Sequence, residues 1–428
     1  MEHLRYLERT ERCSYEELEA IQLGSLRRLL THAYANVPAQ RDSMRAARFH
    51  PNDLRSVSDL AVLPILTRAE LRAQGEGRRS TAAPFCSVKK STSGSTGEPL
   101  AIEYDRDSED WRQAVKLRGY SWAGFRPGVK TLHYWGAGRP SSSKLTRTKI
   151  ALDRGLKREK YLDCGRRNDE DLASVVTTLR AERPDVLIGF SQALADLSRH
   201  IVARRLRDWP SINVICAAER LLPADRELVT AAFGPNVFET YGSREVMLIS
   251  AECEAHAGMH ISMENLLVEV VVRGPSGERP ARPGETGEIV VTDLHNYGMP
   301  FIRYALGDMA TLHDGPPCSC GRALPRIASV DGRVTETLED ATGGRVNGLL
   351  FSTLVLPLGD KLTAYQVVQH RDRSITVRVV STSMDAKDES SLVSDIARYV
   401  GDLPIRVQRL EDLPLEASGK RRLVVVER

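Results

Sequence analysis

The stretch Asp169–Ala217 reads DEDLASVVTTLRAERPDVLIGFSQALADLSRHIVARRLRDWPSINVICA. Apolar side chains recur at helical spacing over 169–183 and 193–205, whereas 186–189 and 213–217 are short, uninterrupted apolar runs. Helices that alternate with short buried strands are typical of a parallel sheet with helices packed on its faces. This stretch therefore predicts an α/β fold.

The segments on either side extend this fold in different ways. An apolar run at 130–134 adds a strand before the helix at 169–183. After residue 258, β-rich runs at 266–272 and 288–292 are joined by glycine and proline turns, which indicates an antiparallel or mixed sheet. We therefore expect a core with at least two sheets.

The N-terminal segment is predicted to be helical from about residue 14 to residue 36. Ser14 and Glu17 match a capping box, in which the side chain of each residue accepts a hydrogen bond from the backbone N–H of the other. The apolar residues that follow at roughly helical spacing are Leu18, Ile21, Leu26, Leu29 and Leu30.

The C-terminal part changes character after Asp331-Gly332-Arg333. Its predicted elements are strands at 375–380, 405–408 and 423–426 and a helix at 389–400. About 95 residues with this pattern form a small α+β domain, within the usual size range. We expect a large N-terminal domain, residues 1–332, with parallel and mixed sheets, and a small C-terminal domain, residues 333–428.

Composition excludes several classes of protein. The 428 residues are 41% hydrophobic and 27% charged, and the net charge of +3 is too small and too scattered to indicate nucleic-acid binding. No run approaches the roughly 20 apolar residues of a membrane helix, and the N-terminus lacks a signal-peptide pattern. We expect a cytoplasmic protein without nucleic-acid or membrane partners. The sequence leaves the oligomeric state open, and a homodimer is compatible with it.

Residues 91–99, which read STSGSTGEP, place hydroxyls and glycines together between two apolar runs. Backbone N–H groups and hydroxyls in such a loop can surround a phosphate chain. The loop is not a Walker loop, because no Gly-Lys-Ser/Thr follows. A plain surface turn has the same composition, so the loop alone does not decide between the two.

Three later motifs bear chemistry that suits a nucleotide. Tyr241 to Glu245 brings an aromatic face and a carboxylate within five residues, and these could stack on a purine and hold magnesium against phosphates. Asp308 follows Gly307 and could accept both hydroxyls of a ribose. Lys420 stands on a Gly/Ser turn and could neutralise a phosphate or a carboxylate. Each motif taken singly also fits an ordinary turn or surface residue.

In this order the motifs resemble the acyl-adenylate-forming superfamily. The resemblance to its phenylacetate-CoA ligase and capsule-biosynthesis adenylating branch rests on Ala217-Ala218-Glu219, Glu252-Cys253, Gly258-Met259-His260-Ile261 and Cys318-Ser319-Cys320-Gly321-Arg322. It implies a hinge near 331–333 and a mobile C-terminal domain that rotates between two half-reactions. The first half-reaction forms an acyl-AMP and pyrophosphate from ATP and a carboxylic acid, and the second transfers the acyl group, usually to coenzyme A.

The resemblance also implies a role for individual residues. The phosphates would be wrapped by Ser93, Gly94, Ser95, Thr96 and Gly97, and the adenine would be flanked by Ala218, Glu219 and Tyr241. The nucleotide would be lined by Gly242, Ser243 and Arg244, while Glu245 would hold Mg²⁺ and Asp308 would bind the ribose hydroxyls. Arg333 would lie at the hinge and contact the nucleotide, and Lys420 would bridge the reacting carboxylate and phosphate.

Two positions depart from the family pattern. Glu98 stands where a lysine is common, and Arg244 stands where Ser or Thr is usual.

Cys253, His260, Cys318 and Cys320 offer three thiolates and an imidazole, which suffice for tetrahedral zinc, and His256 is an alternative ligand. Spacing alone leaves buried, unligated cysteines equally open, because the Cys-x-Cys spacing is tighter than usual. The resemblance implies a structural zinc here. Four protein ligands leave no open coordination position, which fits a structural rather than a catalytic metal.

Two aromatic residues follow predicted strands. Trp135 and Phe190 could meet at the strand ends, where α/β sheets bind ligands, and line a pocket for an aromatic acid. Ordinary core packing is the alternative for both residues.

Three functions remain open. The leading hypothesis is an acid:CoA ligase. A second is adenylation followed by transfer to an amine or another nucleophile. A third, motivated by Glu98 and Arg244, is a nucleotide-binding protein without catalysis.

Overall fold

The structure is a computed structural model. It describes residues 1–82, 87–91, 101–135, 144–164, 167, 169–274, 277–333, 337–342, 345–347, 351, 354–381, 383–413 and 422–427. Contacts divide the chain into two compact units, Met1–Leu306 with Ala310–Val330, and Gly307–Met309 with Asp331–Arg428. The α/β class and the small α+β C-terminal part agree with the prediction.

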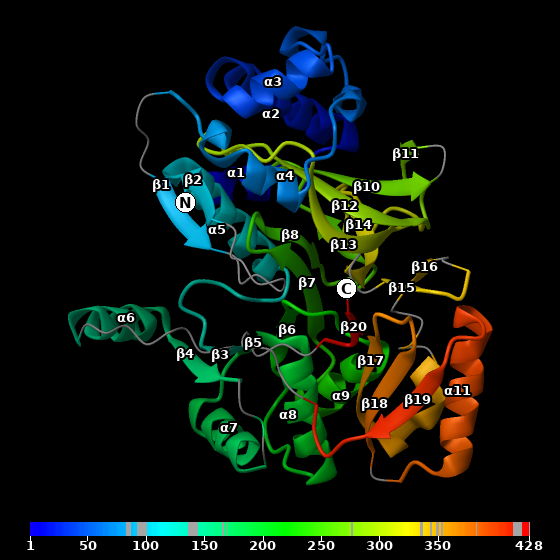
Figure 1. Ribbon diagram of the computed structural model, residues 1–428. Helices are drawn as coiled ribbons and strands as arrows, with labels where there is room; N and C mark the ends of the chain where they lie inside the picture. The colour runs from blue at the N-terminus through cyan, green and yellow to red at the C-terminus, as the bar shows by residue number, and fades with distance from the viewer. Residues whose placement is uncertain are drawn as a thin grey trace. The chain divides into compact units, whose positions relative to one another are not determined.

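The first unit is built on a 12-stranded sheet with the order β11-β10-β12-β13-β14-β9-β8-β7-β6-β5-β3-β4 (Figure 1). Its strands are β3 (Thr131–Trp135), β4 (Glu159–Asp163), β5 (Val186–Phe190), β6 (Asn213–Ala217), β7 (Val237–Ser243), β8 (Met247–Glu252), β9 (Met259–Ile261), β10 (Leu266–Gly274), β11 (Gly277–Pro280), β12 (Thr286–Asp293), β13 (Tyr304–Leu312) and β14 (Arg326–Arg333). β3 to β7 pair in parallel, and the described pairs beyond β7 are antiparallel.

Strand β7 joins the parallel and antiparallel halves, so the separate sheets that the sequence suggested for this core are one sheet. β7 pairs in parallel with β6 and antiparallel with β8, and its register with β8 shifts between Tyr241 and Gly242. A side chain at Gly242 would place its Cβ 2.3 Å from the carbonyl oxygen of Met247. Only glycine therefore fits this irregular pairing, which turns the chain toward Glu245.

Helices cover both faces of the parallel half. Side chains alternate along β5, so that Leu187 packs with α7 (Asp169–Glu182), α8 (Ser191–Ala203) and α9 (Pro223–Phe233), whereas Val186 and Ile188 pack with residues of α5 (Arg106–Ser121) and the segment after it. Successive residues of a strand point to opposite faces. Helix α5 therefore lies on the face opposite α7, α8 and α9.

The N-terminal helices pack on the antiparallel half. α2 (Tyr15–Asn36) begins with the predicted capping box of Ser14 and Glu17. Its Gln22 side chain donates hydrogen bonds to the carbonyls of Met263 and Leu266, at 2.9 and 3.0 Å. The other N-terminal elements include α1 (Glu2–Thr10), α3 (Pro38–Ala46), α4 (Arg68–Ala73) and the hairpin of β1 (Ser87–Ser91) and β2 (Ala101–Asp105).

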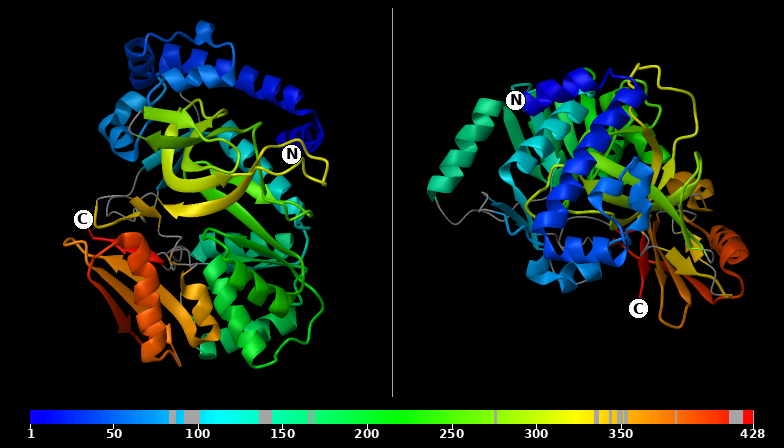
Figure 2. Two further views of the ribbon diagram at one scale, coloured as in Figure 1. Left: turned by 90° about the vertical axis from the view of Figure 1, so that its right-hand side faces the viewer. Right: turned by 90° about the horizontal axis from the view of Figure 1, so that it is seen from above.

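The second unit holds a four-stranded sheet with the order β19-β18-β17-β20. Its strands are β17 (Leu362–Gln369), β18 (Ile375–Ser381), β19 (Ile405–Arg409) and β20 (Val424–Val426), beside a small hairpin of β15 (Thr337–Glu339) and β16 (Arg345–Asn347). Helix α11 (Ala386–Val400) covers one face of the sheet (Figure 2). It begins three residues before the predicted start, because Asp385 caps it with hydrogen bonds from the amides of Lys387 and Asp388.

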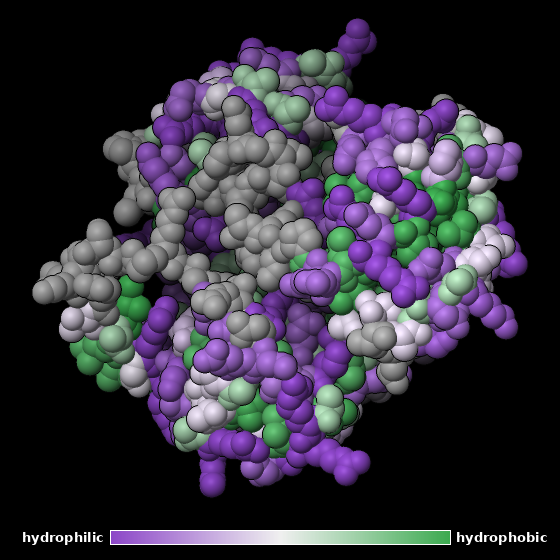
Figure 3. Space-filling model, turned by 60° about the horizontal axis from the view of Figure 1, so that its bottom comes forward, coloured by the Kyte–Doolittle hydropathy of each residue, from purple (hydrophilic) through white to green (hydrophobic). Residues whose placement is uncertain are grey.

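The described helices include none that is both long enough and apolar enough to span a membrane. One of them, α6 (Lys144–Lys157), carries several basic residues. Among the coloured residues of the face drawn in Figure 3, hydrophilic ones predominate, with separate apolar patches between them.

Candidate functional site

The carboxyl ends of the parallel strands gather several predicted site residues in a row. Tyr134 of β3 lies opposite Gly189 of β5, and Phe190 lies opposite Ala217 of β6. Cys216 of β6 lies opposite Glu239 of β7. Trp135 and Phe190 are the last residues of β3 and β5, Ala218 directly follows β6, and Tyr241 lies two residues after Glu239 in β7. These four residues therefore lie along one edge of the sheet. This is the edge at which open α/β sheets bind ligands.

Trp135 and Phe190 are in contact at this edge. Their ring centroids lie 4.4 Å apart with an interplanar angle of 66°, a favourable edge-to-face arrangement. Phe190 is buried in the core cluster on the side of α7 to α9, whereas Trp135 is half-buried. Of the two, Trp135 is the residue that can present an aromatic surface to a ligand, with Phe190 supporting it.

Ala218 and Glu219 follow β6 directly. Ala218 adopts a positive φ of 66° and is exposed. The Glu219 carboxylate accepts a hydrogen bond from the amide of Gln192 at 3.1 Å, and its carbonyl accepts one from Ser191 Oγ at 2.7 Å. A carboxylate at the first turn of a helix satisfies free N–H groups and complements the helix dipole. Glu219 therefore fixes the start of α8 to the end of β6.

Glu245 lies in the turn between β7 and β8 and is held from two sides. Arg112 of α5 donates a hydrogen bond to its carbonyl at 2.5 Å. Arg68 of α4 lies 3.8 Å from one carboxylate oxygen. The Glu245 side chain is 10% exposed. A carboxylate can hold Mg²⁺ together with phosphate oxygens and water, the ligands that Mg²⁺ prefers.

Two neighbours of Glu245 differ in exposure. Tyr241 packs against the core cluster that holds Ile289 and Tyr304. The Arg244 side chain is exposed. Arg244 therefore does not fill the buried side of the turn, where Glu245 lies.

Asp308 lies in β13 directly after Gly307, whose φ is 77°. Asp308 is half-buried. Arg303, the residue directly before β13, anchors the start of this strand. Two nitrogens of its guanidinium group donate hydrogen bonds to Glu269 at 3.1 and 3.0 Å, and a third donates to the carbonyl of Ala61 at 3.0 Å. The strand that carries Asp308 is thus fixed at its start.

Other predicted residues lie outside the described part of the chain. These are Ser93, Gly94, Ser95, Thr96 and Gly97, the predicted phosphate loop between β1 and β2, and Lys420. Arg333 is the last residue of β14, and its side chain is likewise outside the description. Their roles stay predictions.

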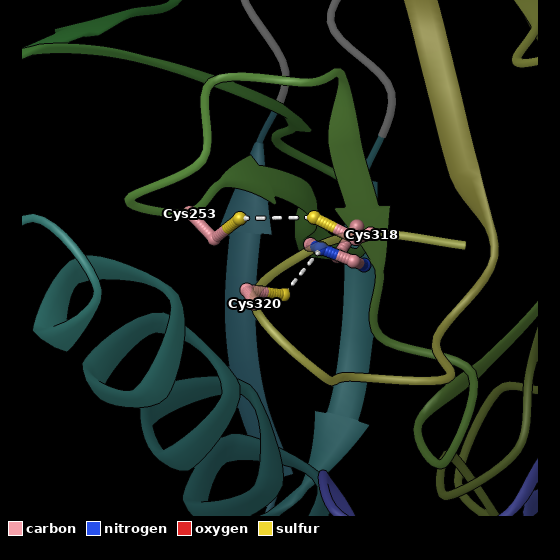
Figure 4. Close-up of side chains that lie close together, drawn as sticks. Cys253, Cys318 and Cys320 are labelled. Atoms are coloured by element: carbon pink, nitrogen blue, oxygen red, sulfur yellow. Dashed lines mark hydrogen bonds between the residues drawn. The ribbon is translucent and has the colours of Figure 1, made fainter. Parts of the chain in front are cut away.

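The four predicted zinc ligands converge. One ligand atom from each of Cys253, His260, Cys318 and Cys320 lies within 4.8 Å of the other three. Figure 4 shows the three cysteine side chains pointing toward one another, with 3.6 Å between the sulfurs of Cys253 and Cys318. Three sulfurs and an imidazole nitrogen match the donor set of tetrahedral zinc.

The structure distinguishes His260 from His256, the alternative ligand. Nε2 of His260 lies 3.3 Å from the sulfur of Cys320, and Nδ1 lies 3.0 Å from the carbonyl of Leu324. His256 turns instead toward Glu252, at 3.6 Å. Burial lowers the pKa of His260 to about 4 and raises the pKa of Cys253 to about 12. The imidazole is therefore neutral, as ligation requires, and a divalent cation would favour the thiolate.

A buried acidic pair next to the sheet edge was not predicted. Arg226 of α9 donates two hydrogen bonds to Glu252, each 2.9 Å, and the amide of Glu239 donates to Glu252 at 2.7 Å. Burial raises the pKa of Glu239 to about 7, and its carboxylate accepts a hydrogen bond from the amide of Leu221 at 3.0 Å and lies 3.9 Å from Arg226. The sequence offers no signal for this group, because its members come from separate elements.

Comparisons with known proteins agree with this architecture. Residues 338–427 match the family of the CapK C-terminal domain. Phenylacetate-coenzyme A ligase of Thermus thermophilus is 25% identical over 387 residues, which cover 87% of this chain and 82% of that protein. The Escherichia coli enzyme of the same name is 28% identical over 349 residues, covering 78% and 75%. The crystal structure of 2-hydroxyisobutyryl-CoA ligase in the postadenylation state has a TM-score of 0.77 at 19% identity, covering 98% of this chain and 92% of that one. The structural likeness confirms the predicted fold.

Proposed function

We propose that this chain, which belongs to the acyl-adenylate-forming superfamily in the branch of the phenylacetate-CoA ligases and CapK, activates a carboxylic acid with ATP and transfers the acyl group to coenzyme A. The observation that carries this proposal is the row of Trp135, Phe190, Ala218 and Tyr241 at one edge of the sheet, with Glu245 in the turn that follows. An aromatic contact, adenine-flanking positions and a metal-binding carboxylate are the parts such a site needs.

The first half-reaction joins two anions. An oxygen of the acid attacks the α-phosphorus of ATP, the bond to the β-phosphate breaks, and pyrophosphate leaves with the electron pair. Cations and oriented N–H donors lower this barrier more than a general base does, because no proton has to be removed from a carboxylate. In the second half-reaction a thiolate attacks the acyl carbon, and AMP leaves.

The residues divide this work between binding and charge compensation. Glu245 would bind Mg²⁺ through its carboxylate, while phosphate oxygens and water complete the coordination. Mg²⁺ supplies positive charge to the phosphates. We assign Ser93 to Gly97 to the phosphates, Asp308 to the ribose, Arg333 to the nucleotide at the hinge, and Lys420 to the charge that develops between carboxylate and phosphate.

Trp135 supports a compact or aromatic acid as the substrate. It is half-buried at the strand end and held edge to face by Phe190. Such a ring offers a flat apolar wall with little conformational freedom to lose on binding. The chemical class of the acid in this proposal is therefore an aryl or similarly compact carboxylate.

We assign a structural zinc to Cys253, His260, Cys318 and Cys320. Cys253 directly follows β8, His260 is the middle residue of β9, and Cys318 and Cys320 lie in the segment before β14. A closed four-ligand site would join these three segments of the antiparallel half. Nε2 of His260 faces the sulfurs because the Leu324 carbonyl orients the ring through Nδ1.

Pyrophosphate release tests the proposal. Protein, ATP and Mg²⁺ are incubated with a panel of aryl and alkyl carboxylates, and the acids that support release are then tested for thioester formation with coenzyme A. Release that requires both an acid and Mg²⁺ is expected, followed by an acyl-CoA product. Release with transfer to an amine but not to coenzyme A would favour the alternative acceptor. No release with any acid would overturn the proposal.

A further inference from the structure

We infer that Arg112 is a positioning residue that sets the place of Glu245 at the predicted magnesium site, an inference that rests on the proposed function. Arg112 and Glu245 are 133 residues apart in the chain, and the guanidinium reaches the Glu245 backbone rather than its carboxylate. The hydrogen bond to the carbonyl fixes the residue without engaging its carboxylate.

Arg112 is buried and is held in several directions. Its Nη1 donates to the carbonyl of Glu245 at 2.5 Å, its Nε donates to Ser108 Oγ at 3.2 Å, and its Nη2 forms a short ion pair with Asp293. The guanidinium lies 4.1 Å from the centre of the Tyr104 ring. A planar guanidinium group whose nitrogens donate to three different groups, and whose face stacks on an aromatic ring, is held in one orientation. The Glu245 carbonyl is therefore tied to a rigid group.

The turn that Arg112 holds is short and irregular. It follows the register shift at Gly242, and Met247, the first residue of β8, has a positive φ of 67°. Within it, the amide of Val246 donates to Ser243 Oγ at 3.3 Å. The hydrogen bond from Arg112 ties this turn to helix α5. Displacing the Glu245 carbonyl also displaces its Cα, and with it the carboxylate.

The contribution of the Arg112–Asp293 ion pair to the free energy of unfolding does not by itself explain why the protein has this pair. The side chains of Arg112 and Asp293 are 2% and 1% exposed, and removing two charges from water offsets much of their attraction. Burial raises the pKa of Asp293, and the charge of Arg112 opposes that shift. A hydrophobic pair of similar volume would be about as stable. What such a pair could not provide is a donor to the Glu245 carbonyl.

Helix α5 carries a matched pair that does not reach the turn. Arg118 forms a bidentate contact with Glu264 at 2.6 and 3.0 Å, and both side chains are fully buried. Arg118 also donates to the carbonyl of Leu7, and Thr10 Oγ1 donates to Glu264 at 2.9 Å. This second pair joins α5 to α1. It is therefore a control for removing a buried Arg–carboxylate pair from the same helix.

The experiment compares two double variants with the wild type. Arg112→Met/Asp293→Leu replaces the first pair, and Arg118→Met/Glu264→Met replaces the second. Hydrogen–deuterium exchange of amides 243–247 is measured without ligand, and the Mg²⁺ concentration for half-maximal pyrophosphate release is measured with a substrate acid. We expect the first variant to exchange these amides at least about 10-fold faster and to need at least about 10-fold more Mg²⁺, as when an outer-shell partner of a metal ligand is lost. We expect the second variant to match the wild type in both.

Equal amide exchange rates and equal Mg²⁺ requirements in the two double variants would overturn the inference, whether both variants differ from the wild type or neither does. If the first double variant does not fold, Arg112→Lys keeps the charge beside Asp293 but loses the fork, and the same two measurements apply. If the wild type releases no pyrophosphate with any acid, the proposed function fails. In that case the exchange rates still show whether Arg112 holds the turn.

Discussion

Nε2 of His260 lies 3.3 Å from the sulfur of Cys320, on the side of the ring opposite the Leu324 carbonyl. A backbone carbonyl only accepts hydrogen bonds, so Nδ1 carries the proton and Nε2 presents its lone pair to the sulfurs. The ring is therefore set in the tautomer that a metal needs.

Zinc analysis tests this arrangement. We expect one zinc per chain by elemental analysis, lost in Cys253→Ser and in Cys320→Ser. Removal by a chelator should lower the melting temperature by several degrees or more, because binding energy at a closed site is also folding energy. Cys164→Ser and Cys216→Ser alter buried cysteines outside the cluster and should keep the metal. Zinc-free protein with an unchanged melting temperature would contradict the assignment.

Loss of the Glu245 charge should impair the first half-reaction. Glu245→Gln keeps the size of the side chain but gives up the anionic oxygen for Mg²⁺, so we expect acid-dependent pyrophosphate release to fall on the order of 100-fold. Glu227→Gln, at an exposed position of α9, is the control. If the Glu245→Gln protein has the wild-type rate and Mg²⁺ dependence, Glu245 does not bind the Mg²⁺ that the reaction uses.

Trp135 should affect the acid more than the nucleotide. In Trp135→Leu we expect the KM for the acid to rise about 10-fold or more, with the KM for ATP nearly unchanged, because an apolar wall is lost from the acid pocket. Trp209→Leu is the control, since Trp209 packs against Phe233 in the same core cluster. Equal changes in both variants would indicate a packing role only.

Glu239 should make the protein less stable as pH rises. Its folded pKa of about 7 lies above the ordinary value of 4.5, so between these values the folded state binds more protons than the unfolded state. The free energy of unfolding therefore falls across this window by about 3 kcal/mol, and this loss of stability is complete above the folded pKa. We expect Glu239→Gln to remove this slope in urea unfolding at pH 4.5 to 8. An unchanged slope in the variant would assign it to other groups.

Local patterns predicted the elements well where periodicity and burial agree. Strand Asn213–Ala217 has the predicted bounds, and α2 starts at the predicted cap. The joining of two predicted sheets through β7 was not visible, because strand pairing depends on register between segments distant in sequence. Family motifs pointed to Glu245 as a predicted Mg²⁺ ligand and to the four predicted zinc ligands.

Long-range contacts could not be inferred from sequence. Arg112 and Arg68 are ordinary arginines in the printed chain, and only the fold brings them to Glu245. Likewise, spacing left His256 and His260 as alternatives, and the direction of each side chain decides between them.

Oxygen transfer from the acid to AMP tests the central claim most directly. A substrate acid labelled with ¹⁸O in its carboxylate is incubated with the protein, ATP, Mg²⁺ and coenzyme A, and the nucleotide products are analysed by mass spectrometry. Attack of the carboxylate on the α-phosphorus predicts AMP that carries one ¹⁸O, together with unlabelled pyrophosphate. Formation of ADP with ¹⁸O in inorganic phosphate would show attack on the γ-phosphorus and would contradict an acyl-adenylate.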